Sequence, residues 1–522
     1  MNRVFKKVVI VLFSAFILVN FAVNINLLGN ALKTSMEQKA DFTQTVDAIQ
    51  QEYISNFKSK NFYINLNGLF ARATGKIVHN NTVRLNNGML LDSKLAKKDV
   101  SLHVDSIVEF DNYLKQFDIP FIYVQAPYKM DYEKALLPDG VENYGNESID
   151  DMVSGLTSKG VNVLDLRPYT SNTIEMVEDN FYPTDHHWNV NGAFIGFQKI
   201  CEKLQGLFPN KNLMNEYVDK SSWDIATYRN ALLGSFGRRT GIFFGGMDDL
   251  SIMTPKFDTE MSLYVNKYGN FRKGDFYTCN IVDKYIKEEK HPLENDAYCI
   301  FIGGDYPLTE SYNRNAKADL KVLIIKDSFT RPVQAFMSTI ISEIDVIDPR
   351  HFKDCTIVEY VQLTKPDVVI FMIGGIAINN KDYMEFGVSS FEEWDETTST
   401  YVLDDIDITI KPKDSSYNSI VMADSLKENA MYKLSLDEIK TLTGNAPAVE
   451  VSLYDSENKT HVIRTVIDTD FANIKGGWIW SFITPETNDG SLQLLMYPGE
   501  IGKTENIGIE VRNISLKETA KK

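Results

Sequence analysis

The hydrophobic pattern divides the chain into three parts, of which the first is a long apolar run over residues 8–28. As a helix, this run spans about 31 Å, which matches the hydrocarbon core of a membrane. Three asparagines weaken its second half: Asn20, Asn24 and Asn26. Three basic residues precede it and place the N-terminus in the cytoplasm: Arg3, Lys6 and Lys7. We therefore expect residues 1–29 to be an uncleaved transmembrane signal anchor or a cleaved signal peptide.

These two alternatives differ in the mature N-terminus that they predict. The text Gly29-Asn30-Ala31 permits cleavage after Ala31, whereas the length of the apolar run favours the anchor. In both cases the rest of the chain is expected on the extracytoplasmic side of the cell membrane. Residues 30–60 are predicted to form a polar helical stem that lifts the following part off the membrane.

In the second part, residues 61–392, short apolar strands alternate with amphipathic helices. Strands are expected within 117–125 and at 161–166, 321–326, 343–347 and 367–373. Helices are expected at 148–159, 192–204, 331–342 and 356–363. This alternation predicts an α/β fold with a doubly wound parallel sheet. The pattern is interrupted around 205–320, which we interpret as an insertion with glycine-rich loops near the site, such as Gly234–Gly241.

The third part, residues 400–522, has short strands and turns in place of the alternation. Seven strands are expected at 401–410, 419–422, 448–454, 461–468, 477–482, 491–497 and 507–514. Their spacing is typical of a β-sandwich. The acidic stretch at 392–400 is the predicted linker.

Composition narrows the classes of function. A chain of 522 residues predicts two or three domains. The net charge of −17 argues against nucleic acid as a partner, because phosphate binding needs concentrated Lys and Arg. Four scattered cysteines match no zinc spacing: Cys201, Cys279, Cys299 and Cys355. Cys279 and Cys299 could pair outside the cell, and buried thiols are the alternative.

Ser328 stands where the predicted strand at 321–326 meets a helix. This position exposes the hydroxyl at the carboxyl edge of a parallel sheet, where open α/β folds bind their ligands. Backbone N–H groups at the helix start are placed to hold a developing oxyanion. The alternative is an ordinary N-cap serine, since Asp-Ser before a helix also suits capping.

A second polar cluster, Thr184–Asn189, contains two of the seven histidines. Asp185 and His187 are two residues apart, so in an extended segment they face the same way. The carboxylate then holds the imidazole Nδ1–H and leaves Nε2 free as a general base for a serine. His186 is expected to point elsewhere, and Trp188 to pack beneath the site. An Asp cap with polar loop histidines is the alternative.

Parallel topology brings strand ends to one edge of a sheet, which predicts a catalytic triad of Ser328, His187 and Asp185. The text Phe181–Ala193 (FYPTDHHWNVNGA) resembles the signature of the DHHW proteins, which are relatives of the AlgX/AlgJ-type alginate O-acetyltransferases in the SGNH hydrolase superfamily. Supporting similarity lies at 64–69, 83–91, 124–129, 156–169 and 326–329.

The resemblance implies an SGNH-like catalytic domain over 61–392, with Ser328 as nucleophile, His187 as base and Asp185 as the residue that orients it. It also implies transfer of an acetyl group to a polysaccharide hydroxyl, with a membrane-bound O-acyltransferase as the acetyl supplier. Two departures predict altered substrate contacts. Lys326 replaces the glycine of the superfamily's Gly-Asp-Ser block, and Phe371–Asn380 lacks the acidic-Arg text of relatives.

The C-terminal part resembles jelly-roll carbohydrate-binding modules in three stretches: Met431–Ser435, Gly476–Thr484 and Leu494–Gly502. Trp478 and Trp480 are two apart and share a strand face. A sugar-binding platform is one interpretation, and core tryptophans are the commoner one.

The favoured function is extracytoplasmic O-acetylation of an exported or cell-surface polysaccharide. A carbohydrate esterase with the same triad and a non-enzymatic polysaccharide-binding scaffold are the alternatives. We expect no cofactor and no metal. The expected partners are the polysaccharide, the membrane through the N-terminal helix, and the acetyl-supplying membrane protein.

Overall fold

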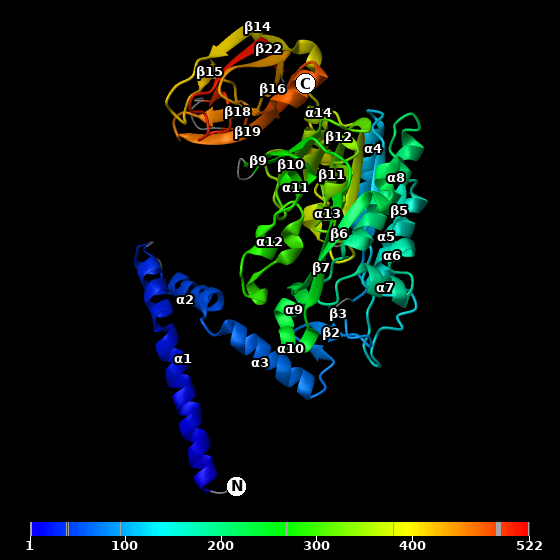
Figure 1. The fold of residues 1–522 in the computed structure, drawn as a ribbon, viewed down its shortest axis with the longest axis vertical. Helices are drawn as coiled ribbons and strands as arrows, with labels where there is room; N and C mark the ends of the chain where they lie inside the picture. Colours follow the sequence, from blue (N-terminus) through cyan, green and yellow to red (C-terminus); the bar gives the residue numbers. More distant parts are fainter. Residues whose placement is uncertain are drawn as a thin grey trace.

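The computed structural model describes residues 3–37, 39, 41–93, 96–266, 270–378, 380–486, 492–519 and 521. Predicted segments that include other residues, such as the strand beginning at Ser491, extend outside this described part. The chain begins with three helices, α1 (Arg3–Glu37), α2 (Phe42–Asn56) and α3 (Lys60–Ala73) (Figure 1). Within the described residues, α1 is the one helix that is long and apolar enough over Ile10–Glu37 to cross a membrane. This finding fits a signal anchor and a signal peptide equally.

The predicted stem is helical, but it does not continue straight from α1. Instead, α2 packs back against α1 (Figure 1). Tyr63 of α3 donates a hydrogen bond to Asn20 Oδ1 at 2.8 Å, and the backbone N–H of Lys58 donates to Asn24 Oδ1 at 3.0 Å. Two of the asparagines that interrupt the apolar run therefore bond α3 and the segment that joins α2 to α3.

An eight-stranded mixed sheet forms the centre of the molecule, in the order β5-β4-β13-β11-β12-β10-β8-β9. Five neighbouring strands are parallel: β5 (Val163–Asp165), β4 (Phe121–Gln125), β13 (Val368–Ile373), β11 (Ala318–Lys326) and β12 (Ile341–Ile347). The predicted parallel sheet is confirmed for these strands. Their near-continuous apolar text reflects burial on both faces.

Three further strands extend this sheet in the antiparallel sense: β10 (Leu308–Asn313), β8 (Met261–Val265) and β9 (Asn270–Gly274). The sequence pattern around 205–320 did not predict these strands, because polar and aromatic residues obscure the alternation of apolar and polar positions. The same region contains a separate two-stranded ribbon of β6 (Trp223–Leu232) and β7 (Asp248–Pro255). A small three-stranded sheet precedes the main one: β1 (Val78–His79), β2 (Thr82–Arg84) and β3 (Leu90–Asp92).

Helices pack on the main sheet in two groups. Phe194 and Phe197 of α8 (Val190–Leu207) contact Phe336 of α13 (Thr330–Met337), with ring centroids 5.4 and 5.8 Å apart. Tyr113 of α4 (Ser101–Lys115) accepts a hydrogen bond from Gln362 of α14 (Ile357–Thr364) at 2.9 Å. The remaining helices are α5 (Gly145–Ser158), α6 (Arg167–Thr170), α7 (Ile174–Asn180), α9 (Ser235–Thr240), α10 (Ile242–Gly245), α11 (Phe276–Asn280), α12 (Lys284–Lys287) and α15 (Thr469–Lys475).

The largest error in a predicted helix boundary is at the end of α13. The helix expected at 331–342 ends at Met337, and β12 begins at Ile341. The hydroxyls of Ser338 and Thr339 donate to the carbonyls of Ala335 and Phe336, each at 2.8 Å, and these bonds close the helix. Ile341 then enters the sheet, where a β-branched side chain packs better than on a helix.

The C-terminal part consists of two antiparallel sheets around a core of its own. One has the order β14-β22-β16-β20 with β17 also paired to β22, and the other has the order β15-β21-β18-β19. The strands are β14 (Thr400–Ile410), β15 (Ile420–Ala423), β16 (Met431–Leu436), β17 (Glu438–Thr443), β18 (Ala448–Asp455), β19 (Thr460–Asp468), β20 (Trp478–Ile483), β21 (Leu492–Tyr497) and β22 (Gly508–Thr519). The pattern missed β16 and β17, because only Asp437 separates them and no turn signal marks the boundary.

The C-terminal sheets contact the main sheet on the side of β8 and β10 (Figure 1). Asp468, whose side chain is fully buried, accepts from Lys273 at 2.8 Å and from Arg314 at 2.5 Å. Tyr264 packs there with Ala448 and Val466. A buried carboxylate with two cationic partners thus joins the two parts.

The four cysteines are unpaired in the structure. Cys201, Cys279 and Cys299 are buried, and Cys355 is half-buried. The structure therefore shows thiols at Cys279 and Cys299, where the sequence left a disulfide open.

Candidate active site

Ser328 lies in the turn between β11 and α13, and its side chain is half-buried. The preceding Asp327 fixes this turn. Its Oδ1 accepts the backbone N–H of Phe329 at 3.0 Å, and its Oδ2 accepts the backbone N–H of Gly374 at 2.7 Å. A Cβ on Gly374 would lie 2.7 Å from the Phe329 ring, so this close approach needs a glycine. The N-cap residue of α13 is Phe329 and not Ser328, and the Ser328 hydroxyl has another partner.

The hydroxyl of Ser328 meets His187 from the loop before α8. Ser328 Oγ lies 2.6 Å from His187 Nε2, and His187 Nδ1 lies 2.6 Å from Asp185 Oδ1. An ionised carboxylate only accepts hydrogen bonds, so Nδ1 carries the proton and Nε2 accepts from the serine. Asp185 Oδ1 also accepts the backbone N–H of His187 at 2.9 Å. The structure thus brings together all three residues that the sequence selected.

The second oxygen of Asp185 has a partner that the sequence did not predict. Oδ2 accepts the backbone N–H of Ser235 at 2.6 Å, at the start of α9. A Cβ on Gly234 would lie 2.3 Å from Asp185 Cβ, so a glycine is needed at that position. The glycine-rich segment beginning at Gly234 does lie beside the site, as the sequence led us to expect.

Burial would raise the pKa of Asp185, but the neighbouring imidazoles and their hydrogen bonds outweigh it and hold the pKa well below 3.8. Asp185 is therefore a carboxylate at neutral pH. It stabilises an imidazolium that forms when His187 accepts a proton.

Aromatic rings fix the plane of His187. The Tyr298 ring stacks on the imidazole with centroids 3.8 Å apart and planes at 8°. Tyr298 is 4% exposed, and its hydroxyl has no hydrogen-bond partner among the described residues. Trp188 is buried, as expected, and its Nε1–H donates to the carbonyl of Phe329 at 3.1 Å, which ties the histidine loop to the serine turn.

The expectation that His186 points away is wrong. Its ring lies beside that of His187, with centroids 3.7 Å apart, and its Nδ1 lies 2.8 Å from Ser235 Oγ. Burial, and then the neighbouring His187, lower the pKa of His186 to about 3, so it is neutral. Asp185, His186 and His187 place ligand atoms within 4.8 Å of one another. Both nitrogens of His187 are already hydrogen-bonded, however, so the geometry favours a triad over a metal centre.

Lys129 is a buried cation that the sequence did not single out as functional. It is 1% exposed, and its ammonium donates to the carbonyls of Tyr182 at 3.0 Å, Pro183 at 3.1 Å and Asp185. Burial lowers the pKa of Lys129 to about 7, although Asp248 and Asp185 oppose the shift. Asp248 in turn accepts the N–H and the hydroxyl of Thr184, at 2.9 and 2.7 Å. Lys129 and Asp248 therefore both bond the loop that carries Asp185 and His187.

A second network of charges lies next to Ser328. Asp305 is within 2.5 Å of Lys326, 2.9 Å of Arg331 and 3.1 Å of Arg350. Lys326 is the residue that departs from the superfamily's glycine, and here its side chain has a defined ionic role. The positive charges at the start of α13 are therefore anchored and compensated.

One family model matches part of the chain. Residues 87–229 match the family model described as ALGX: SGNH hydrolase-like domain, acetyltransferase AlgX. This stretch is an AlgX-like domain. It includes Asp185 and His187 and ends before Ser328. The resemblance carried by residues 181–193 is thus confirmed over the matched residues. A search of the curated proteins found no match.

Several solved structures are similar to the chain. Bacillus cereus PatB1 is 20% identical, with a TM-score of 0.48 over 59% of this chain and 100% of its own. A DHHW family protein from Eubacterium siraeum is 19% identical, with a TM-score of 0.44 over 60% of this chain and 96% of its own. The O-acetyltransferase domain of Pseudomonas putida AlgJ is 13% identical, with a TM-score of 0.36 over 60% and 95%.

Proposed function

We propose that the protein is an extracytoplasmic O-acetyltransferase that moves an acetyl group through Ser328 onto hydroxyls of an exported or cell-surface polysaccharide. The observation that carries the proposal is the chain of two 2.6 Å hydrogen bonds from Ser328 through His187 to Asp185. The match of residues 87–229 to an acetyltransferase family model supports the reaction class.

The proposed reaction has two halves. Ser328 Oγ attacks the acetyl carbonyl while His187 Nε2 accepts its proton, and the imidazolium then protonates the leaving oxygen. The product is an acetyl ester on Ser328. A sugar hydroxyl next attacks this ester, His187 takes the hydroxyl proton, and the serine is regenerated with its hydrogen.

The proposed organisation is a membrane helix within 1–29, helices over 30–60, a catalytic domain over 61–392 and a β-sandwich over 400–522. A signal anchor would keep the site on the outer face, within reach of a membrane-bound O-acyltransferase that supplies acetyl groups. The β-sandwich is proposed as a carbohydrate-binding module. No cofactor takes part in the proposed reaction.

An esterase is the second candidate, because the same acyl-enzyme is resolved by water. The two differ only in the acceptor. A non-enzymatic scaffold is a third possibility, and the aligned triad disfavours it.

The decisive experiment uses the full-length protein in detergent with a chromogenic acetyl ester, alone and with oligosaccharides. Ser328→Ala is the negative control, and Ser390→Ala, at an exposed serine outside the site, is the matched control. Ser328-dependent transfer to sugar at the expense of hydrolysis supports the transferase. Equal acetate release with and without sugar supports the esterase. Absence of both turnover and an acetylated Ser328 by mass spectrometry contradicts both enzyme proposals.

A further inference from the structure

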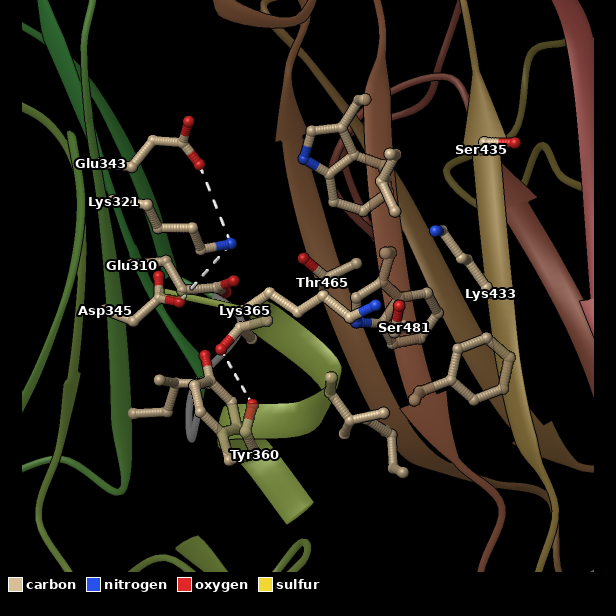
Figure 2. A pocket seen from close by; sticks show the side chains of 18 of the residues that line it. Glu310, Lys321, Glu343, Asp345, Tyr360, Lys365, Lys433, Ser435, Thr465 and Ser481 are labelled. Carbon is tan, nitrogen blue, oxygen red and sulfur yellow. Dashed lines mark hydrogen bonds and ion pairs between the residues drawn. The ribbon is translucent and has the colours of Figure 1, made fainter. Parts of the chain in front are cut away.

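A cavity of about 550 Å³ lies between the main sheet and the C-terminal sheets, and none of the triad residues lines it. Figure 2 shows it from close by, with strands of the main sheet on one side and C-terminal strands on the other. Sites for small molecules usually have volumes of about 300–1,000 Å³. The cavity is therefore large enough for a ligand that the acyl-transfer site does not hold.

The wall from the main sheet carries three carboxylates around one lysine. Lys321 of β11 lies 3.8 Å from Glu343 and 3.9 Å from Asp345, both on β12. Glu310 of β10 is directly opposite Asp345 in the sheet. Burial and then the charge of Asp345 raise the pKa of Glu310 to about 8. This wall therefore offers carboxylates that accept hydrogen bonds and an ammonium group that donates them.

The opposite wall comes from β16, β19 and β20 of the two C-terminal sheets, of which β19 and β20 are edge strands. Trp478 and Trp480 are half-buried and share a face of β20, where they pair across from Leu436 and Leu434. Both line the cavity. Both tryptophans pack against the C-terminal core and also border the cavity. They therefore combine features of core residues and of a binding platform.

An independent feature of this wall is Thr465 on β19. It is 1% exposed, yet its hydroxyl has no hydrogen-bond partner among the described residues. Figure 2 shows Thr465 facing Lys321 and Glu310 across the cavity. An unsatisfied buried hydroxyl is unfavourable relative to a bonded one. A ligand hydroxyl in the cavity would satisfy it.

The charges around the cavity balance. Five acidic residues line it: Glu310, Glu343, Asp345, Asp354 and Asp437. Five basic residues also line it: Lys321, Lys365, Lys433, Arg464 and Lys475. A balanced set does not select an ion. Carboxylates and ammonium groups beside aromatic rings suit a neutral molecule that both donates and accepts hydrogen bonds and has apolar faces.

We propose that this cavity is a second ligand site that holds a neutral segment of a saccharide chain between the two parts of the protein. The ring faces of the sugar would pack on Trp478 and Trp480, and its hydroxyls would bond Thr465 and the Lys321 cluster. This proposal deepens the carbohydrate-binding role proposed for the β-sandwich and rests on it, whereas the site is distinct from Ser328 and does not depend on acyl transfer.

The test is isothermal titration of the full-length protein, in detergent and carrying Ser328→Ala, with cellotetraose and with fully N-acetylated chitotetraose. Tetraglucosamine serves as the charged comparator. Thr465→Val keeps the shape of the side chain and removes the hydroxyl, and Thr441→Val on exposed β17 is its matched control. We expect one neutral tetrasaccharide to bind, and Thr465→Val to weaken that binding about fivefold to tenfold.

A second variant, Asp345→Asn, should weaken binding as well, which keeps the test valid if Thr465→Val does not fold. Hydrolysis of the chromogenic ester, measured with Ser328 intact, should be unchanged in both variants. The proposal is overturned if neither neutral tetrasaccharide binds, if only tetraglucosamine binds, or if Thr441→Val weakens binding as much as Thr465→Val. Failure of ester turnover alone would count against the proposed acyl transfer and leave this site standing.

Discussion

Asp305 and Glu310 are five residues apart in the chain, and their electrostatic surroundings are opposite. Asp305, beside the serine turn, has Lys326, Arg331 and Arg350 within 3.1 Å. Burial opposes it, but Lys326 and Arg331 lower the pKa of Asp305 below 3.8. Glu310 instead lies opposite Asp345 in the sheet and accepts a 3.4 Å hydrogen bond from Tyr312, and its pKa rises to about 8.

Asp305 and Glu310 show that one sheet can bury a carboxylate in two different electrostatic surroundings. At the carboxyl edge, Asp305 is neutralised by cations that the protein itself supplies, so this part of the site is organised before any substrate arrives. On the face beneath the C-terminal sheets, carboxylates outnumber their nearest cation. Such an arrangement reduces stability and leaves hydrogen-bonding capacity for a ligand.

The substitution Asp185→Asn, at the carboxyl edge of the sheet, has the largest expected effect. An asparagine keeps the shape but cannot stabilise the imidazolium, and it favours the wrong tautomer of His187. We expect kcat for ester turnover to fall about 10⁴-fold with KM little changed. Steady-state kinetics measure this, with thermal unfolding to show that the fold is intact. A loss below tenfold would mean that the Asp185–His187 bond has no role in catalysis.

Asp468→Ala tests a carboxylate that is fully partnered but lies far along the chain from the triad. Removing it leaves the half-buried Lys273 and Arg314 with only the exposed carboxylates of Asp470 and Glu260, which should cost about 3–5 kcal/mol of unfolding free energy. Urea unfolding followed by tryptophan fluorescence measures the change. The exposed pair partner Asp470 provides the control, because Asp470→Ala should cost below about 1 kcal/mol. Equal losses of unfolding free energy in the two variants would show that the buried carboxylate is no more important for stability than the exposed one.

Lys129→Met tests whether a buried ammonium positions the triad loop. Loss of its three hydrogen bonds should reduce kcat about 10- to 100-fold and leave KM nearly unchanged, because Lys129 acts through Asp185 and His187 rather than on substrate. Since burial lowers the pKa of Lys129 to about 7, wild-type kcat should also fall as pH rises through 7 and the ammonium loses a donor.

The pH profile distinguishes positioning from general destabilisation. The decline above pH 7 should be absent in Lys129→Met. If wild type and variant show parallel profiles, Lys129 does not have the positioning role, whatever its effect on stability.

The smallest expected effect concerns Glu310. Because its folded pKa of about 8 is above 4.5, the folded protein retains a proton that the unfolded chain releases between these pH values. Stability should therefore fall as pH rises from 4.5 to 8, and Glu310→Gln should remove that slope. We expect the variant to be more stable at pH 8 by about 1–2 kcal/mol, measured by urea unfolding at pH 5 and 8. Glu505→Gln, at an exposed position, is the control, and equal slopes in Glu310→Gln and wild type would refute the prediction.

Local patterns were enough to select the three residues of the candidate triad. Ser328 follows a run of buried residues and precedes a helix, and Asp185 and His187 share a face because strand geometry repeats every two residues. The apolar run at 8–28, the five parallel strands and most strands of the C-terminal sheets follow from periodicity in the same way. Boundaries failed where no glycine or proline marks a turn, as between β16 and β17.

Tertiary structure alone decided what surrounds those residues. Ser235 follows Asp185 by 50 positions and Tyr298 follows His187 by 111, and no local pattern specifies which distant amide or ring will pack there. The antiparallel extension of the sheet and the cavity beneath the C-terminal strands arise in the same way. Periodicity determines which face of an element is buried, whereas the partner of that face is chosen by the packing of the whole chain.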